Sequence, residues 1–225
     1  MYNRLLTNKD ISEFKNHIDL NGYREKFRHR ELWDKNDALL KWIAVIKNFS
    51  EIEREGLDVV DLGCGSSCPP KIISLMNNNV TGIEYVSEYV GDFYKDSDVN
   101  VLIGDAFSIV GNMQHESVDV FYDCCSVTHF NVNYSDDTKN LGWRDMSELI
   151  YRSLRKGGYF IVSSDVRFSD SYGEFINPLD IIEIVERSGM SLVSKFNTEC
   201  LSEIDNYSFE YRGMPMGVVS LVFKK

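Results

Sequence analysis

Apolar and polar positions alternate along the chain with two different periods, and the change between them falls near residue 57. Before Gly56 the apolar positions recur every three to four residues, as on one face of an amphipathic helix. Two such stripes are present: Ile11, Phe14 and Ile18, and then Leu39, Leu40, Ile43 and Ile46. Asn36 or Asp37 is a suitable cap for the second helix. Residues 1–56 are therefore expected to form a helical N-terminal lid or extension.

From Leu57 onward short apolar runs alternate with amphipathic stretches, which indicates strand followed by helix. The runs predict strands near 57–62, 79–84, 99–104, 117–123, 158–164, 191–196 and 217–223. The amphipathic stretches predict helices near 70–77, 87–94, 143–155 and 178–188. This alternation is typical of a mostly parallel sheet with helices on both faces. The expected fold class is α/β, with a single doubly wound, Rossmann-like sheet of seven strands in a domain over residues 57–225.

Two details refine this expectation. Gly157-Gly158 is suited to end a helix and start a strand. No helical pattern separates the last two strands, so they are expected to pair antiparallel, joined by a polar and aromatic loop over 200–216.

Composition narrows the classes of function. The 225 residues suffice for one α/β domain with a modest appendage, and 43% of them are hydrophobic, as in a folded protein. With 24 basic and 35 acidic residues the net charge is −11, which disfavours nucleic acid or an anionic membrane surface as the main partner. No apolar run has the length of a membrane span, and the N-terminus lacks a signal-peptide core. The five cysteines form no disulfide framework, which favours reduced thiols in a cytoplasmic protein.

The segment DVVDLGCG at 58–65 is the strongest functional signal. A β-branched run leads to Asp61, and the glycines Gly63 and Gly65 follow. Glycines permit positive φ and let a ligand approach the backbone closely. Asp61 is expected at the C-terminal edge of its strand, where open α/β sheets bind their ligands.

Two further acids follow at the ends of the next two strands. Glu84 is placed to accept both hydroxyls of a ribose, and Asp105 to accept a hydrogen bond from an adenine amino group. A dinucleotide fingerprint requires Gly where Cys68 stands, and a carboxylate at Asp61 would repel a pyrophosphate. Asp61 instead suits a ligand with an ammonium and a cationic centre and no phosphate, as in S-adenosylmethionine.

The ordered motifs DLGCG, GIEY, GDAF, SVDVFYDCCSVTHF and LRKGGYFIVSSD over roughly residues 57–165 resemble those of the class I S-adenosylmethionine-dependent methyltransferases. The resemblance implies that Asp61, Gly63 and Gly65 face the methionine part, Glu84 the ribose, and Asp105 with Ala106 the adenine. The usual third glycine falls at Ser67. The full set expected to contact the cofactor is Asp61, Gly63, Cys64, Gly65, Glu84, Tyr85, Asp105, Ala106, Phe107 and Asp123.

By the same resemblance, the stretch after the fourth strand lines the rim beside the transferred methyl group. His129 is the first candidate for a general base, since its unperturbed pKa is about 6.5; its alternative role is to cap or pack the loop. Asp123 is the second candidate, and its alternative role is a backbone or cofactor contact. Cys64, Cys68, Cys124 and Cys125 are expected to gather nearby. Packing is their preferred role, because their spacing is not that of a zinc site, and a metal or arsenic-type thiol site is the alternative.

Other segments are candidates for the substrate pocket. A basic cluster, YREKFRHR at 23–30, is either a solvated helix face or a binding site for an anionic group, and Trp33 follows it. Further candidates are Asn131, Asn133, Tyr134, Trp143, Arg144 and the stretch 167–175; Trp143 could equally begin the core face of its helix.

Taken together, the sequence predicts a methyltransferase acting on a small molecule. A hydroxyl of a sugar, glycan precursor or natural product is the preferred acceptor, through His129. Methylation of a small amine stays open, and so does the choice between monomer and homodimer. The alternative outside the enzymes is a catalytically inactive subunit that binds a nucleoside. It is disfavoured because Asp61, Glu84 and Asp105 are all present. No metal is expected.

Overall fold

The computed structural model describes residues 1, 3–7, 9–10, 12, 36–130, 141–167, 176–198, 209–211 and 214–225. The strands in these ranges are β1 (Arg4–Leu5), β2 (Asp58–Leu62), β3 (Asn79–Glu84), β4 (Val99–Ile103), β5 (Val118–Cys124), β6 (Leu154–Arg167), β7 (Ser191–Leu192), β8 (Phe209–Tyr211) and β9 (Met214–Lys224). The helices are α3 (Asn36–Ser50), α4 (Pro69–Ser74), α5 (Ser87–Val90), α6 (Ala106–Gly111), the 3-10 helix η2 (Val127–His129), α7 (Leu141–Ser153) and α8 (Pro178–Arg187).

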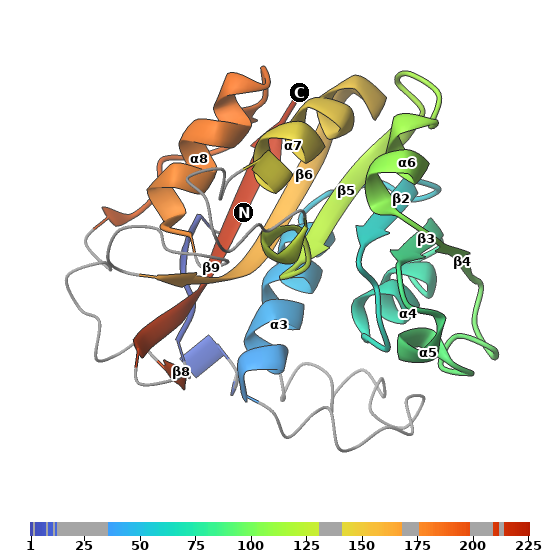
Figure 1. Cartoon of the computed structure of the whole chain (residues 1–225), viewed down its shortest axis with the longest axis horizontal. Coiled ribbons are helices and arrows are strands. Elements are labelled where there is room, and N and C mark those ends of the chain that lie inside the picture. The colour runs from blue at the N-terminus through green and yellow to red at the C-terminus, as the bar shows by residue number, and fades with distance from the viewer. Residues whose placement is uncertain are drawn as a thin grey trace.

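The strands form one sheet, in the order β1-β9-β6-β5-β2-β3-β4 (Figure 1). Strands β2 to β6 are mutually parallel, whereas β9 pairs antiparallel with β6. The short strand β7 also pairs antiparallel with β9. The chain runs outward from β2 to β4, then returns to β5 beside β2 and continues to β6. This confirms the doubly wound, mostly parallel fold with an antiparallel last strand.

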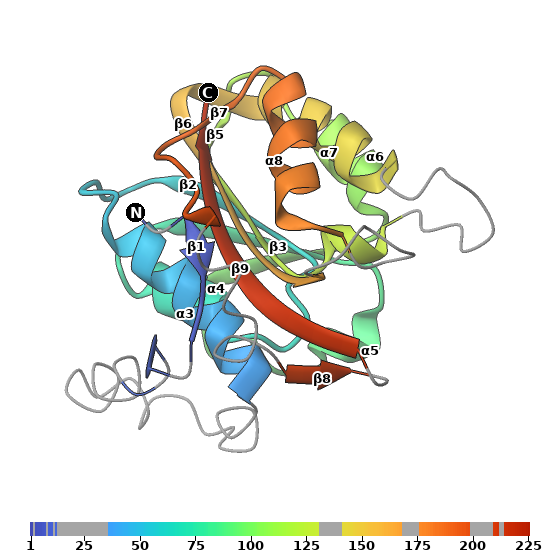
Figure 2. The same cartoon turned by 90° about the vertical axis from the view of Figure 1, so that its left-hand side faces the viewer.

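Helices cover both faces of the sheet (Figure 2), because the strands bury side chains on both sides. One apolar cluster joins α3 and α4 to one face, and a second joins α6, α7 and α8 to the other. Alternate residues of a strand point into different clusters: Val59 of β2 belongs to the first and Val60 to the second. The helix α3 therefore forms part of the layer that covers the sheet.

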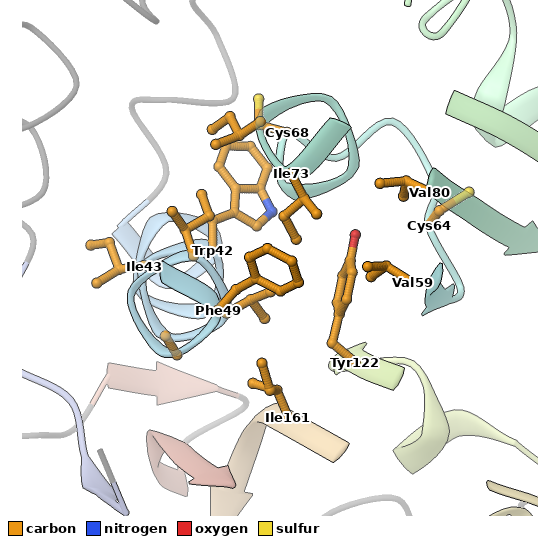
Figure 3. Close-up of a cluster of buried hydrophobic side chains, with 14 of the residues drawn as sticks. Trp42, Ile43, Phe49, Val59, Cys64, Cys68, Ile73, Val80, Tyr122 and Ile161 are labelled. Carbon is orange, nitrogen blue, oxygen red and sulfur yellow. The ribbon is translucent and has the colours of Figure 1, made fainter. Parts of the chain in front are cut away.

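The first cluster reaches up to the functional end of the sheet. Trp42 and Phe49 extend from α3 toward α4, and Tyr122 of β5 points into the space between Phe49 and Val59 (Figure 3). The Tyr122 side chain is fully buried. Its hydroxyl group forms no hydrogen bond among the described residues. A polar atom is thus buried inside an otherwise apolar layer, next to the site described below.

Several local expectations need correction. The strand β6 begins at Leu154, so Gly157-Gly158 lies inside it and does not separate a helix from a strand. Gly157 has φ of +77°, and the pairing of β5 with β6 shifts register near Val118, so the two glycines lie at an irregularity of the strand pair. The expected loop over 200–216 contains a short antiparallel pair, β8 with β9.

Besides β8 and η2, the helix α6 and the strand β1 were absent from the prediction. The helix α6 is only six residues long, too short for a clear helical period. The strand β1 pairs with β9 across most of the length of the chain, and two residues carry no readable strand pattern. The first predicted helical stripe, over Ile11, Phe14 and Ile18, lies outside the described residues.

Candidate active site

A cavity lies at the carboxyl ends of the parallel strands, where the chain reverses direction across the sheet between β2 and β5. Open α/β sheets bind ligands at this switch point. The cavity has a volume of about 320 Å³. Its walls are formed by Gly63, Ile83, Glu84, Tyr85, Gly104, Asp105, Ala106, Phe107, His129 and Phe130. The sequence placed seven of these ten residues in the site; Ile83, Gly104 and Phe130 were not singled out.

The glycine turn after β2 closes one side of the cavity. Gly63 and Gly65 have φ of +71° and +43°, in the region that favours glycine. A side chain at Gly63 would overlap the side chain of Ser126, whose hydroxyl donates to the Gly63 carbonyl at 3.1 Å. A Cβ at Gly65 would meet only the Glu84 carboxylate, at 3.9 Å. Gly63 is therefore needed for packing against the loop after β5, whereas the space beside Gly65 is open.

Asp61 lies under the turn as a fully buried carboxylate. Neither of its oxygens has a hydrogen-bond partner among the described residues. Burial raises the pKa of Asp61 well above its usual value, and the charges of Asp123 and Glu84 add to the rise, while the neighbouring Tyr122 hydroxyl opposes it. The Tyr122 hydroxyl is a neighbouring donor, and the remaining acceptor positions of this buried carboxylate suit a ligand that brings a cation or N–H groups.

Glu84, at the end of β3, is held by backbone groups. Its Oε2 accepts from the Gly65 N–H at 2.9 Å, and its Oε1 accepts from the N–H groups of Tyr85 and Val86 at 2.8 and 3.1 Å. These bonds fix the carboxylate at the cavity wall and tie the glycine turn to the neighbouring strand. With two acceptor positions on each oxygen, Oε2 keeps one position for a ligand hydroxyl.

Asp105 begins the helix α6 and lines the cavity on the side of β4. Its Oδ2 accepts from the Ser108 N–H at 2.8 Å, which caps the helix. The other oxygen is left for a ligand. Ala106 and Phe107 follow in the cavity wall, and Tyr85, which is 73% exposed, also lines the cavity.

The loop after β5 supplies the facing wall. His129 ends the short helix η2 and is exposed, in the same cavity as Glu84 and Asp105. Asp123, in contrast, is fully buried and does not line the cavity. Its Oδ1 accepts from the N–H groups of Ser126 and Val127 at 2.8 and 2.9 Å, which holds the loop in place. Burial raises the pKa of Asp123 to about 7, although these two bonds and the charge of Lys41 pull it down.

Three of the four cysteines of the two loops, Cys64, Cys68 and Cys124, pack in or against one apolar cluster, whereas Cys125 contacts Asp165. Cys64 and Cys68 are buried in the apolar cluster of α3 and α4, and burial raises the pKa of both thiols, that of Cys68 to about 12. Cys124 and Cys125 follow β5 and are half-buried. In the described part of the chain, no three His, Cys, Asp or Glu side chains are grouped to hold a metal ion.

Several pocket candidates are not tested by this structure. The basic cluster at 23–30, Trp33, Asn131, Asn133, Tyr134 and the stretch 168–175 lie outside the described residues. Trp143 is buried in the core beneath α7, which agrees with its core interpretation. Arg144 is exposed and pairs with Asp145.

Comparison with known proteins identifies the chain. Residues 60–162 match the family profile described as a methyltransferase domain. These are the residues that build the glycine turn, Glu84, Asp105 and the loop with His129. This match and the shared fold support the class I S-adenosylmethionine-dependent methyltransferase family that the sequence motifs resemble. Its cofactor is S-adenosylmethionine. No match is found among curated protein sequences.

Solved methyltransferases share the fold. A methyltransferase from Archaeoglobus fulgidus is 14% identical, with a TM-score of 0.61 over 92% of this chain and 99% of that one. A TehB-like methyltransferase from Corynebacterium glutamicum is 16% identical, with a TM-score of 0.56 over 91% and 97%. A phosphoethanolamine N-methyltransferase from Haemonchus contortus is 15% identical, with a TM-score of 0.58 over 82% of this chain and 52% of that one. At such identities the likeness concerns the fold. No helix in the described ranges is long and apolar enough to cross a membrane.

Proposed function

We propose that this methyltransferase binds the adenosine of its cofactor between Glu84 and Asp105 and transfers the methyl group to a hydroxyl of a small molecule. The observation that carries the proposal is the shared cavity: Glu84, Asp105 and His129 all line it. An acid–base group facing a cofactor cavity is placed for proton transfer from an incoming hydroxyl.

The cofactor fits the groups available. The unpaired Asp61 carboxylate suits the ammonium of the methionine part. The free position on Glu84 Oε2 and the free oxygen of Asp105 suit the ribose and the adenine amino group. Ala106 and Phe107 supply apolar contacts for the adenine, and the exposed Tyr85 supplies a ring over the ribose. The bound sulfonium activates its own methyl group, so the chain must mainly align the acceptor and exclude water.

His129 is proposed as the general base that takes the hydroxyl proton as the methyl group moves. Asp123 is less suited to this role, because its Oδ1 is used by two backbone N–H groups and it lies behind the cavity wall. Asp123 is instead proposed to position the His129 loop. Cys64 and Gly65 are proposed to contact the cofactor through the backbone of the turn.

Calorimetric titration tests the cofactor site. Asp61→Ala and Glu84→Ala are expected to abolish binding of S-adenosylmethionine, while Glu88→Ala, on the exposed surface of α5, keeps it. Unchanged affinity in either variant would refute the assignment of the site.

A panel of sugars, other alcohols and small amines, assayed for release of S-adenosylhomocysteine, tests the acceptor class. With a hydroxyl acceptor, His129→Ala is expected to slow turnover about 10²-fold while cofactor affinity is kept. A near-normal rate would remove the base role from His129. A small amine is the second candidate acceptor, because the fold is shared with an N-methyltransferase of phosphoethanolamine. Activity with amines alone would favour it.

A further inference from the structure

A second polar cluster lies at the same edge of the sheet, beyond the switch point on the side of β6. It joins Asp165 of β6, Cys125 of the loop after β5 and Lys41 of α3. The Asp165 Oδ2 accepts from the Lys41 Nζ at 2.9 Å and from the Cys125 Sγ at 3.2 Å. The Asp165 backbone N–H in turn donates to the Cys125 Sγ at 3.4 Å. Lys41 and Cys125, from two other elements, thus hold the Asp165 carboxylate in a fixed orientation.

The other oxygen of this carboxylate has no donor. The Asp165 Oδ1 is buried and has no hydrogen-bond partner among the described residues. An unsatisfied buried acceptor destabilises the folded protein. A carboxylate oxygen can only accept, so the missing partner must bring an O–H or N–H group. Asp165 therefore offers a vacant oxygen, Oδ1, next to the Oδ2 that Lys41 and Cys125 already use.

Cys125 shows that the cluster is held against a local backbone cost. It has φ of +66°, which is uncommon for a residue other than glycine. Such conformations persist where the surroundings enforce them, and they gather at functional sites. Burial raises the pKa of the Cys125 thiol to about 12, so the thiol stays protonated and acts as a donor to Asp165. The two contacts with Asp165 are the surroundings that hold Cys125 in place.

The cluster around Asp165 lies next to the glycine turn after β2. Ser126, the next residue after Cys125, donates to the Gly63 carbonyl at 3.1 Å. The cofactor cavity lies over β2, β3 and β4, whereas Asp165 lies over β6 on the opposite side of the switch point. A reacting partner that meets the cofactor across this crevice would reach the ends of β5 and β6.

The charges of the cluster indicate the kind of partner. Lys41 is half-buried and its pKa is raised: burial lowers the pKa, but Cys125 and Asp165 outweigh that effect. Its ammonium therefore balances the Asp165 carboxylate at neutral pH. A cationic ligand group at the Asp165 Oδ1 would be repelled by the nearby Lys41 ammonium, whereas a neutral hydroxyl would not be.

We propose that Asp165, oriented by Lys41 and Cys125, binds a neutral hydroxyl of the methyl acceptor. This inference rests on the proposed function, methyl transfer to a hydroxyl. His129 lines the cofactor cavity and Asp165 does not, so the reacting hydroxyl and the hydroxyl held by Asp165 are different groups. The acceptor class is accordingly a molecule with at least two hydroxyls.

The test uses cofactor analogues that reach toward Asp165 and therefore needs no knowledge of the acceptor. In these probes a nitrogen replaces the sulfur of S-adenosylhomocysteine and carries an arm of two to four carbons ending in a hydroxyl. Matched probes end in a methyl ether, which cannot donate, or in an ammonium. Calorimetry gives the affinity of each probe for the wild-type enzyme and its variants. The best hydroxyl arm is expected to bind about tenfold more tightly than its methyl ether.

Variants of Asp165 test whether this residue accepts the hydrogen bond from the hydroxyl of the probe arm. In Asp165→Asn the amide oxygen stays on Lys41 and the NH₂ group faces the arm, so the tenfold preference for the hydroxyl should disappear while S-adenosylhomocysteine affinity is kept. Asp165→Ala should give the same loss, and Asp145→Asn, on the surface of α7, should leave the preference intact.

Three results would overturn the proposal. The first is that the wild-type enzyme binds the hydroxyl and ether arms equally well at every arm length. The second is that the preference for the hydroxyl arm survives in both Asp165 variants, or is lost in His129→Ala instead. The third is that the wild-type enzyme prefers the ammonium arm. Failure of S-adenosylhomocysteine itself to bind would refute the cofactor site, and so separates the two hypotheses.

Discussion

Replacing Asp123 by Asn should make the protein more stable at alkaline pH than the wild type. The side chain is fully buried, and its Oδ1 accepts from the N–H groups of Ser126 and Val127. The amide oxygen of Asn can accept both bonds, so the substitution removes the ionisable group and keeps the loop anchored. The pKa of Asp123 is raised to about 7, which means that the folded protein holds this proton more tightly than the unfolded chain does.

The difference between the folded and unfolded pKa values sets the sign and the size of the change in the free energy of unfolding with pH. Between the ordinary pKa of about 3.9 and the folded value, the unfolded state loses the proton first, so the free energy of unfolding falls as the pH rises. At about 1.4 kcal/mol for each pKa unit, the full loss is about 4 kcal/mol, and about 3 kcal/mol of it falls between pH 5 and pH 8. The Asn variant lacks this loss. Its advantage over the wild type should therefore grow by up to about 3 kcal/mol from pH 5 to pH 8.

Urea unfolding of both proteins at pH 5 and pH 8, followed by circular dichroism, measures the effect. Asp92→Asn is the matched control, since Asp92 is exposed and the same change there removes an ionisable group from the surface. If the stability difference between Asp123→Asn and wild type were the same at both pH values, or if the variant were the less stable at pH 8, the buried charge would not be the cause.

Three further predictions concern the cavity. Because the Asp61 pKa is raised, an ammonium ligand must displace a proton there; S-adenosylmethionine affinity should rise as increasing pH removes that proton, and calorimetry on Asp61→Asn should show weak binding without this rise. Gly63→Ala should lower the free energy of unfolding by about 2–4 kcal/mol, and Ser126→Gly in the same chain should restore part of it; no recovery would exclude the overlap as the cause. Glu84→Gln should lose at least one backbone hydrogen bond and about 1–3 kcal/mol by thermal unfolding, whereas unchanged stability would mean that the carboxylate does not anchor the turn.

The acids of the cavity could be predicted because each lies at the end of a strand. Once the strands were recognised from their apolar runs, Glu84 and Asp105 had to meet at one edge of the sheet, since parallel strands end together. The backbone bonds to Glu84 carried no sequence signal, because any residue provides an N–H group. Asp123 shows the same limit: its position was foreseen, but its contacts with Ser126 and Val127 depend on the turn that follows.

The cluster around Asp165 could not be predicted from sequence patterns. Lys41 and Asp165 are 124 positions apart, and each looks like an ordinary polar residue in its own element. Their contact arises only because α3 packs against the face of the sheet that includes β6. The prediction of a helix end at Gly157 was wrong for the opposite reason. The local sequence signal for a helix end was present, but the pairing of β6 with β5 extended the strand through this glycine.

The position of β9 has a consequence for how the chain folds during synthesis. Of the described strands, β9 is translated last, yet it lies between β6 and β1, and β1, β7 and β8 pair only with it. Until it leaves the ribosome, β6 presents an unpaired edge to other nascent chains. The pairing of β1 with β9 also closes a loop of nearly the whole chain, which slows folding. The nascent chain should therefore depend on chaperones, and be most prone to aggregate, before residues 214–224 emerge from the ribosome. Pauses in translation just before these residues should alter the yield of folded enzyme.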